Sequence, residues 1–327
     1  MEDMREGVTN KAGVGPETKC EMKARHVAEY LALRTVAAVF RMLPYRAALA
    51  VAWCLAWVGH HVVRYRVETA RLRIRSVFGD SLDTRGVRRV AWLSWRNFVF
   101  GAVDLARVAA ADRAWIEAAV ENTGPFEETA NALKETGKGA ILASPHMGAW
   151  DLAGVVLQRL GVPIFFIAAP QKNPLVDRFL GELRGATGVA LIARGSAAMR
   201  TAIERLRGGQ WMAMLPDVRA PAEGVSVRFL GGAANVYRGM AVAARRADVP
   251  IVVGIAVRRG WARHAWRLAR VVRPDHSAPL EEDIRRMTQE VFDEIEKGIR
   301  DAPEQWFWYN KRWILDPLPS ATSGANG

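Results

Sequence analysis

Residues 139–154, which read Gly-Ala-Ile-Leu-Ala-Ser-Pro-His-Met-Gly-Ala-Trp-Asp-Leu-Ala-Gly, constrain the fold more than any other stretch of the chain. The apolar run Gly139–Ser144 lies between a Gly and a Pro and predicts a short buried strand. Pro145–Gly148 has the composition of a turn, and Ala149–Leu160 has apolar residues at helical spacing. His146 is therefore predicted to lie where a buried strand passes into a helix. In open α/β sheets, crevices of this kind bind ligands.

Asp151 lies in the first turn of the predicted helix, five residues after His146. The two would not share a helix face, because five steps of about 100° separate them. With His146 in the preceding turn, the carboxylate can reach back to one ring nitrogen. The other nitrogen would then face the crevice as a general base, beside helix N–H groups that favour negative charge. The same spacing also suits a core histidine hydrogen-bonded to a nearby acid, so the residues alone leave both interpretations open.

Patterns typical of other chemistries do not occur in the chain. Ser144 precedes His146 by two residues and would point away from it, which disfavours a Ser–His nucleophile pair. There is no Gly-x-Ser-x-Gly elbow, no Walker loop and no Gly-x-Gly-x-x-Gly fingerprint. The six histidines are scattered, and Cys20 and Cys54 form no metal or redox pattern. We therefore expect neither a metal nor a bound cofactor.

An excess of basic residues points to an anionic partner. The chain has 46 Lys and Arg against 34 Asp and Glu, a net charge of +12. Nucleic acid, an anionic membrane surface and an acidic carrier protein are the partners that such a charge suits. No zinc-finger spacing, helix-turn-helix pattern or ribonucleoprotein motif accompanies the charge, so we expect no nucleic-acid partner.

The N-terminal part of the chain divides into two segments. Residues 1–20 are polar and are expected to form a disordered tail without a signal peptide. Residues 21–66 are expected to form apolar helices that associate with a membrane, and a buried helix of a soluble protein is the alternative. Within them, Ala47–Val63 has no Lys, Arg, Asp or Glu and is close to the lower length limit for a bilayer span. Arginines on both sides favour helices lying in the interface, where the arginines of residues 64–96 would meet anionic head groups.

Between residues 67 and 316, short apolar runs alternate with amphipathic helical stretches. Further strands are expected at Pro163–Ala168, Val189–Ala193, Trp211–Leu215, Val225–Leu230, Ile251–Val257 and Ala265–Val272. Further helices are expected at Arg88–Arg107, Phe126–Glu135, Leu175–Leu183, Ser196–Leu206, Gly239–Arg246 and Glu282–Ile299. The alternation predicts an α/β fold with a mostly parallel central sheet flanked by helices. The tryptophans at 306, 308 and 313 are interpreted as a packed C-terminal helix, and residues 317–327 as a disordered tail.

Three blocks of the chain carry a family resemblance. They are Gly139–Asp151, then Pro303–Trp308 with Lys311-Arg312-Trp313, and Leu215-Pro216-Asp217 with Gly224–Gly231. All three resemble signatures of the bacterial lipid A late acyltransferases, which belong to the broader His-x4-Asp/Glu glycerolipid acyltransferases. The resemblance extends from about Tyr30 to Trp313.

The resemblance implies a membrane-associated O-acyltransferase on the cytoplasmic face of the cell inner membrane. His146, oriented by Asp151, would deprotonate a hydroxyl of a lipid A precursor or similar glycolipid, and the oxygen would attack an acyl thioester. The implied donor is acyl carrier protein, or coenzyme A. The resemblance also implies substrate-binding roles for further residues, namely Arg194, Asp217, Lys172 and Glu304.

Several features leave alternatives open. The family commonly has Glu at the position of Asp151, Asn at Ala149 and Gln at Val218. These departures leave room for a lysophospholipid or a phosphatidylinositol mannoside as the acceptor, because mannoside acyltransferases of actinobacteria share the scaffold. A non-catalytic membrane-binding homologue is a third alternative. From the residues alone, Asp217 also suits a turn cap and Arg194 a surface side chain.

Overall fold

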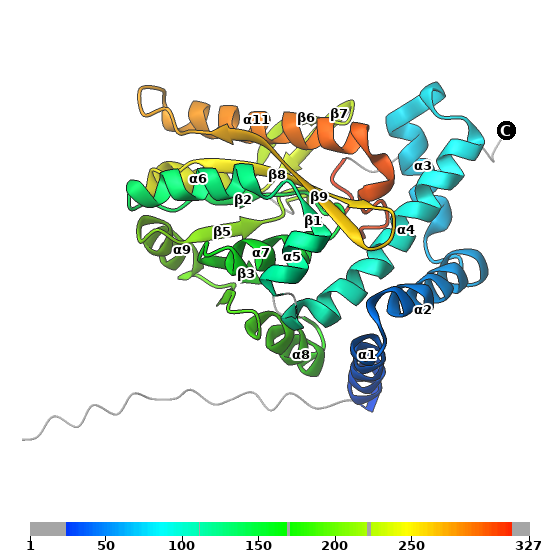
Figure 1. Cartoon of the computed structure of the whole chain (residues 1–327). Helices are drawn as coiled ribbons and strands as arrows, with labels where there is room; N and C mark the ends of the chain where they lie inside the picture. Colours follow the sequence, from blue (N-terminus) through cyan, green and yellow to red (C-terminus); the bar gives the residue numbers. More distant parts are fainter. Residues whose placement is uncertain (1–23, 111, 169–170, 221–223, 316–327) are drawn as a thin grey trace, which may run out of the picture.

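The centre of the protein is a seven-stranded sheet. The computed structural model describes residues 24–110, 112–168, 171–220 and 224–315. The strand order is β1-β9-β8-β2-β5-β3-β4, and all neighbouring strands are parallel except β8 and β9 (Figure 1). The strand bounds are β1 Val120–Glu121, β2 Ile141–Ala143, β3 Ile164–Ala168, β4 Ala190–Ala193, β5 Trp211–Met214, β8 Ile251–Arg259 and β9 Arg263–Val272. The predicted α/β fold with a mostly parallel sheet is confirmed.

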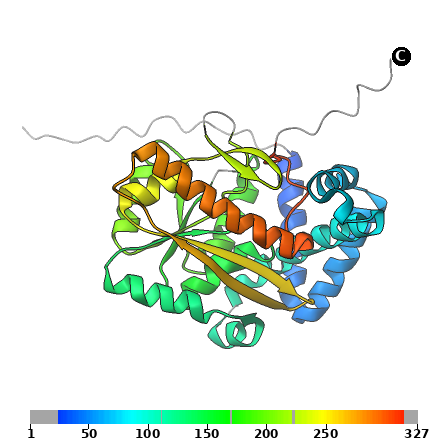
Figure 2. The ribbon, with the colours of Figure 1, turned by 90° about the horizontal axis from the view of Figure 1, so that it is seen from above.

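Helices cover both faces of the sheet. The helices that cover the two faces are α5 Arg113–Ala119, α6 Gly124–Glu135, α7 Trp150–Arg159, α9 Ala198–Arg207, α10 Gly239–Ala247 and α11 Leu280–Asp301. The first three pack on one face and the last three on the other. Figure 2 shows α11 lying over the sheet alongside the β8–β9 hairpin. Ile141 and Ala143 of β2 enter one core and Leu142 enters the other, as the two-residue period of a strand requires.

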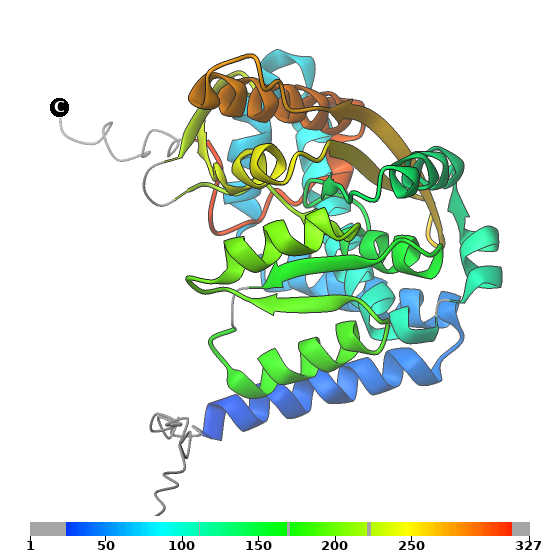
Figure 3. The ribbon, with the colours of Figure 1, turned by 90° about the vertical axis from the view of Figure 1, so that its left-hand side faces the viewer.

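A third core joins the N-terminal helices to the α/β domain. The remaining helices are α1 Ala24–Met42, α2 Tyr45–Trp57 with the π-helical turn η1 Val58–Val62, α3 Val67–Phe78, α4 Thr84–Arg107 and α8 Pro174–Gly185, and the short 3-10 turns are η2 Gly79–Ser81, η3 Val108–Ala110 and η4 Pro303–Gln305. Phe40, Leu49, Phe100 and Phe179 meet in this core, one from each of α1, α2, α4 and α8. Figure 3 shows α1 running along α8 at the edge of the molecule.

A bilayer span requires a helix that is both long and apolar. No single helix in the described part of the chain meets both conditions. One bent pair, Tyr45–Val62 and Val67–Ser81 at 86° to each other, meets the requirement by length and composition only. The membrane association expected for residues 21–66 therefore stays a prediction, and the tails expected at 1–20 and 317–327 lie outside the described residues.

The C-terminal tryptophans are packed, as expected, but the predicted helix there is wrong. Trp306, Trp308 and Trp313 are buried, yet Trp306 follows the short η4 turn with extended backbone angles of −80° and 146°. The reason is where the backbone hydrogen bonds go. Phe307 donates its N–H to the carbonyl oxygen of His146 at 2.9 Å, so the segment pairs with the turn after β2 rather than with itself.

Three short elements were not expected from the sequence. Strand β1, helix α5 and strand β7 Gly232–Val236 are each too short or too rich in small residues to give a periodic pattern. The strand expected at Val225–Leu230 is present as β6 Val225–Phe229, but it pairs with β7 in a separate antiparallel hairpin against α11.

A buried ion pair connects the N-terminal helices to the sheet. The carboxylate of Asp104 on α4 accepts hydrogen bonds from the guanidinium of Arg258 on β8 and from the hydroxyl of Tyr45 on α2, the latter at 2.7 Å. Both charged side chains are almost completely buried, with 0% and 2% of their area exposed. Burial and the charge of Asp104 raise the pKa of Tyr45, which keeps its proton on the hydroxyl.

Replacing Asp104 by Ala is expected to lower the free energy of unfolding by about 3–5 kcal/mol, because Arg258 would stay buried without its carboxylate. The matched control is Glu117→Ala, which removes the exposed pair of Glu117 with Arg113 and is expected to cost at most about 1 kcal/mol. Denaturant unfolding followed by circular dichroism measures both. Similar small losses for the two variants would contradict a stabilising role for the buried pair.

Candidate active site

His146 lies where the sequence predicts it, in the turn between β2 and α7 at the carboxyl edge of the sheet. Gly148 in the same turn has a φ of +61°, and a Cβ there would come within 2.4 Å of the carbonyl oxygen of Ala256. Only glycine fits both constraints. The N–H of Gly148 donates to the carbonyl oxygen of Gln305 at 3.0 Å, so β8 and the C-terminal segment together hold the turn that presents His146.

Asp217 is the hydrogen-bonding partner of His146. The ring atom Nδ1 of His146 lies 2.7 Å from Oδ1 of Asp217, and the backbone N–H of His146 donates to Oδ2 at 2.8 Å. The indole N–H of Trp306 donates to the same Oδ2 at 2.7 Å. Asp217 follows β5, which runs parallel to β2, so the two strands end at the same edge. Its side chain is 1% exposed, and it is therefore a buried carboxylate with every partner supplied by the site.

The expectation that Asp151 orients the ring of His146 through a hydrogen bond is wrong, because Asp217 makes that bond and Asp151 binds Arg184. Oδ1 of Asp151 accepts a hydrogen bond at 3.1 Å from the guanidinium of Arg184 on α8. The physical reason is that Asp217, arriving from β5, already occupies Nδ1 and the backbone N–H of His146. Asp151 still lies near the ring, because it lines the same cavity and its charge acts on the imidazole.

His146 and Asp151 line a cavity of about 460 Å³ under α7. Its other polar side chains include Gln171, Arg184 and Thr187. Most of the wall is apolar, with contributions from Leu105, Leu142, Trp150, Val155, Phe166, Ile167, Val189, Met212, Met214, Leu215 and Val218. A cavity with a few convergent polar groups on an apolar wall is typical of sites that bind small molecules or acyl chains.

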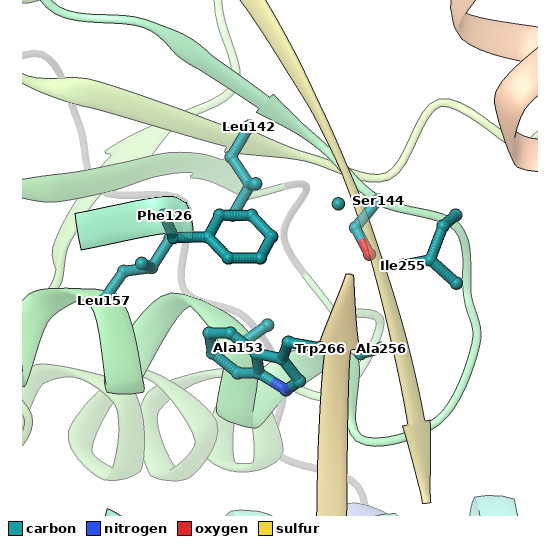
Figure 4. A pocket seen from close by; sticks show the side chains of 9 residues that line it. Phe126, Leu142, Ser144, Ala153, Leu157, Ile255, Ala256 and Trp266 are labelled. Atoms are coloured by element: carbon teal, nitrogen blue, oxygen red, sulfur yellow. The ribbon is translucent and has the colours of Figure 1, made fainter. Parts of the chain in front are cut away.

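Ser144 lines this cavity and also a second, smaller hollow. Figure 4 shows its hydroxyl among apolar side chains that include Phe126, Leu142 and Ile255, with Trp266 below. Within the described residues, the hydroxyl has no hydrogen-bond partner. The prediction that Ser144 does not pair with His146 is therefore consistent with the geometry.

The other predicted binding residues lie outside the lining of the cavity. Arg194 is exposed, with its guanidinium 5.7 Å from the ring centre of Tyr237, and Lys172 is also exposed. Glu304 is half-buried in η4, where its backbone oxygen accepts a hydrogen bond from Asn97. The substrate-binding roles of Arg194, Lys172 and Glu304 stay predictions.

The sequence did not predict two contacts of the site, that of Arg184 with Asp151 and that of Trp306 with Asp217. Arg184 had no signal, because a basic residue near the end of an amphipathic helix is normally a surface side chain. Trp306 belongs to the C-terminal signature block, but nothing in a sequence shows that its indole reaches a carboxylate in another block.

The pKa values of the pair are set by opposing effects. Burial lowers the pKa of His146, but the charge and the hydrogen bond of Asp217, with a smaller effect of Asp151, raise it above its ordinary value. Burial raises the pKa of Asp217, but His146, Trp306 and the backbone N–H together lower it. Both directions favour the ion pair. The stabilisation linked to His146 is complete below its ordinary pKa and is lost as pH rises through the raised value.

The arrangement suits a general base that acts on a substrate in the cavity. With Nδ1 bound to Asp217, the ring has its tautomer set and Nε2 has no hydrogen bond within the described residues. At the start of α7, the N–H groups of Trp150 and Asp151 have no acceptor among the described residues and can stabilise a developing negative charge. In the described part of the chain, no group of three or more His, Cys, Asp or Glu side chains is placed to hold a metal ion.

Comparison with known proteins gives one consistent result. A family model described as bacterial lipid A biosynthesis acyltransferase matches residues 17–314. A phosphatidylinositol mannoside acyltransferase of Mycolicibacterium smegmatis is 26% identical over 185 residues, which are 56% of this chain and 59% of that protein. A lipid A biosynthesis acyltransferase of Haemophilus influenzae is 28% identical over 177 residues, which are 54% of each chain. The chain thus spans somewhat more than half the length of these relatives.

We expect the ring of His146 to titrate above the ordinary histidine pKa in the wild type and below it in Asp217→Asn, because burial then prevails. Asp151→Asn is expected to lower the pKa much less, since its charge is the smaller effect. Histidine ring resonances followed by NMR against pH, assigned with His146→Gln, measure this. An equal shift in both variants would contradict the assignment of Asp217 as the main partner.

Proposed function

Because the chain belongs to the bacterial lipid A biosynthesis acyltransferase family, we propose that it is an O-acyltransferase that moves a fatty acyl group from a thioester to a glycolipid hydroxyl. The observation that carries the proposal is the His146–Asp217 pair, whose histidine lines a largely apolar cavity. A base of this kind, without a nucleophilic partner in hydrogen-bond contact, suits direct attack by the acceptor.

In the proposed reaction, Nε2 of His146 takes the proton of the acceptor hydroxyl while the oxygen attacks the thioester carbonyl carbon. The new C–O bond gives a tetrahedral oxyanion, which the free N–H groups at the start of α7 stabilise. The C–S bond then breaks, and the departing thiolate takes the proton from the imidazolium. Asp217 stabilises the imidazolium between these two proton transfers. The thioester supplies the driving force, so the reaction needs no metal or bound cofactor.

The apolar wall of the cavity is the proposed place for the acyl chain. The wall lies between the sheet and helix α7, which follows the His146 turn. The sheet contributes Leu142 of β2, Phe166 of β3 and Met212 of β5, and α7 contributes Val155. An acyl chain there would bring its carbonyl end close to His146. The exclusion of water from such a wall would also favour acyl transfer to the acceptor over hydrolysis.

The acceptor proposed first is a lipid A precursor, in line with the family model and the Haemophilus influenzae relative. A phosphatidylinositol mannoside is the second candidate, because the Mycolicibacterium smegmatis relative carries that name. Purified enzyme offered both acceptors and a lysophospholipid, with the products identified by mass spectrometry, distinguishes them. Transfer to the lysophospholipid alone would contradict a glycolipid acceptor.

Association with the cytoplasmic face of the inner membrane is part of the proposal. Large apolar side chains that remain exposed are concentrated in the N-terminal helices, among them Met42, Trp57, Val62 and Val63. A soluble domain rarely keeps so many apolar side chains in water along one segment. Contact with a membrane would cover them and bring the cavity close to lipid substrates.

His146→Ala and Asp217→Asn are each expected to reduce kcat strongly, by about 10²- to 10⁴-fold, through loss of the base and of its tautomer. Because the two residues act as one unit, the double variant is expected to lose little more than the worse single variant. A steady-state acyl transfer assay on folded proteins measures this, with the exposed Asp80→Asn as control. Losses that multiply in the double variant would show that the two residues do not act together.

We also expect an acyl carrier protein thioester to be preferred over a coenzyme A thioester. The carrier is acidic and this chain carries a net charge of +12, so electrostatic steering should raise the association rate and weaken with salt. The measurement is kcat/KM for both donors across a salt series. Equal efficiency at low salt, or a preference for coenzyme A, would contradict the carrier protein as donor.

A further inference from the structure

A separate hollow, of about 750 Å³, is lined by residues of η1, α3 and the first half of α4 and of the link between η1 and α3. Helices α3 and α4 are labelled at the right of Figure 1. Its lining is strongly basic and consists of His60, His61, Arg64, Arg71, Arg85, Arg88, Arg89 and Trp92. None of these residues lines the cavity that holds His146. The hollow is therefore separate from the proposed catalytic cavity.

The positive charge of the hollow is poorly compensated by the protein. Glu68 accepts hydrogen bonds from Arg64 and Arg71, at 2.5 and 2.9 Å. On α4, helical spacing places three further arginines on one exposed face, and within the described residues none has a carboxylate partner: Arg85, Arg88 and Arg89. Five guanidinium groups thus line the hollow, and the carboxylate of Glu68 contacts two of them.

His60, one of the residues that line the hollow, is affected by the same positive charges. Burial, and after it the charges of the nearby His61, Arg71 and Arg64, lower the pKa of His60 to about 4. His60 instead stays neutral, with Nδ1 at 3.1 Å from the hydroxyl of Tyr309. The fold keeps this imidazole uncharged next to arginines that cannot lose their charge, so an anion in the hollow would relieve their mutual repulsion.

Phosphate is the anion that the donors fit best. A guanidinium presents a planar fork of N–H groups that matches two phosphate oxygens, and several forks around one hollow suit a group with several charged oxygens. The indole of Trp92 adds an apolar wall on the same helix face. The volume exceeds what a single phosphate needs, so a larger headgroup that carries phosphate fits it better.

The surroundings of the hollow favour a lipid as the source of that phosphate. Side chains of the η1 turn and of the residues just after it are apolar and exposed, with Val62 at 63%, Val63 at 67% and Tyr65 at 40%. An amphiphile would satisfy both features at once, with its headgroup among the arginines and its chains against these side chains. An acidic protein would meet the arginines but would leave the valines without an apolar partner.

We propose that this hollow is a binding site for the phosphate-bearing headgroup of a membrane lipid, distinct from the acceptor and the acyl donor. It shares with the proposed function the contact with a membrane, but it does not depend on acyl transfer. Its role is to orient the protein on the bilayer, with the arginines of α4 in the headgroup layer.

The test is flotation of the full chain with two kinds of phosphatidylcholine vesicle, matched in total surface charge. One contains phosphatidic acid, whose phosphomonoester is exposed, and the other phosphatidylglycerol, whose phosphodiester is shielded. Wild type is expected to bind the phosphatidic acid vesicles more tightly. Arg88→Gln with Arg89→Gln should weaken that binding by about thirtyfold, since each arginine contributes about fivefold near a surface.

The matched control is Arg200→Gln with Arg285→Gln, which removes the same charge from exposed arginines outside the hollow. The control is expected to weaken binding to both vesicles slightly and equally. Equal losses in the two double variants, or no preference of wild type between the vesicles, would overturn a discrete headgroup site.

Two further arms separate other sources of the anion. In the first, soluble glycerol phosphate is added as a competitor, and the lipid assignment is wrong if it competes as well as the lipid does at equal concentration. In the second, binding to acyl carrier protein is measured, and the lipid assignment is wrong if Arg88→Gln with Arg89→Gln weakens only that binding. His146→Ala, which tests acyl transfer, is expected to bind vesicles as wild type does. Failure of the headgroup site therefore leaves the proposed reaction untouched, and failure of the reaction leaves the site untouched.

Discussion

The carboxylate of Asp217 is the charge on which the architecture of the site depends. A buried carboxylate is costly unless hydrogen bonds replace the water it loses, and here three donors do so: the ring and the backbone N–H of His146, and the indole of Trp306. These donors come from two segments far apart in sequence. The parallel pairing of β2 and β5 brings the first segment to Asp217, and the C-terminal segment supplies the second.

The C-terminal segment connects this charge to the rest of the molecule. The side-chain oxygen of Gln305 accepts the backbone N–H of Arg258 at 2.9 Å, and the backbone oxygen of Trp306 accepts the hydroxyl of Ser94 on α4. Arg258 in turn pairs with Asp104, which also binds Tyr45 of α2. A continuous set of polar contacts therefore runs from His146 to the helices proposed to face the membrane.

Local patterns predicted the elements of the fold well, and long-range contacts explain what they missed. The strand–turn–helix around His146 was predictable because periodicity and turn composition are encoded within sixteen residues. The partner of His146 was not, because Asp151 is close in sequence whereas Asp217, 71 residues away, is close in space. Likewise, the C-terminal tryptophans were predicted to lie on a helix from the sequence alone. Their spacing carries no information about the backbone hydrogen bond that this segment makes to a distant turn. The sequence singled out Asp217, but for a different role.

The two carboxylates near His146 differ in what neutralises them, and this difference assigns their roles. Asp151 has a permanent counter-charge in Arg184, with both side chains partly exposed, at 29% and 24%. Asp217 has none, and the described cation nearest to it is the imidazolium that forms when His146 takes a proton. Burial lowers the pKa of His146, and of the two carboxylates Asp217 does more than Asp151 to raise it. The Asp151–Arg184 pair instead lines the cavity with its charges already balanced. In the proposed reaction, Asp217 would therefore support the proton transfer at His146, and the Asp151–Arg184 pair would be the charged group that faces the substrate.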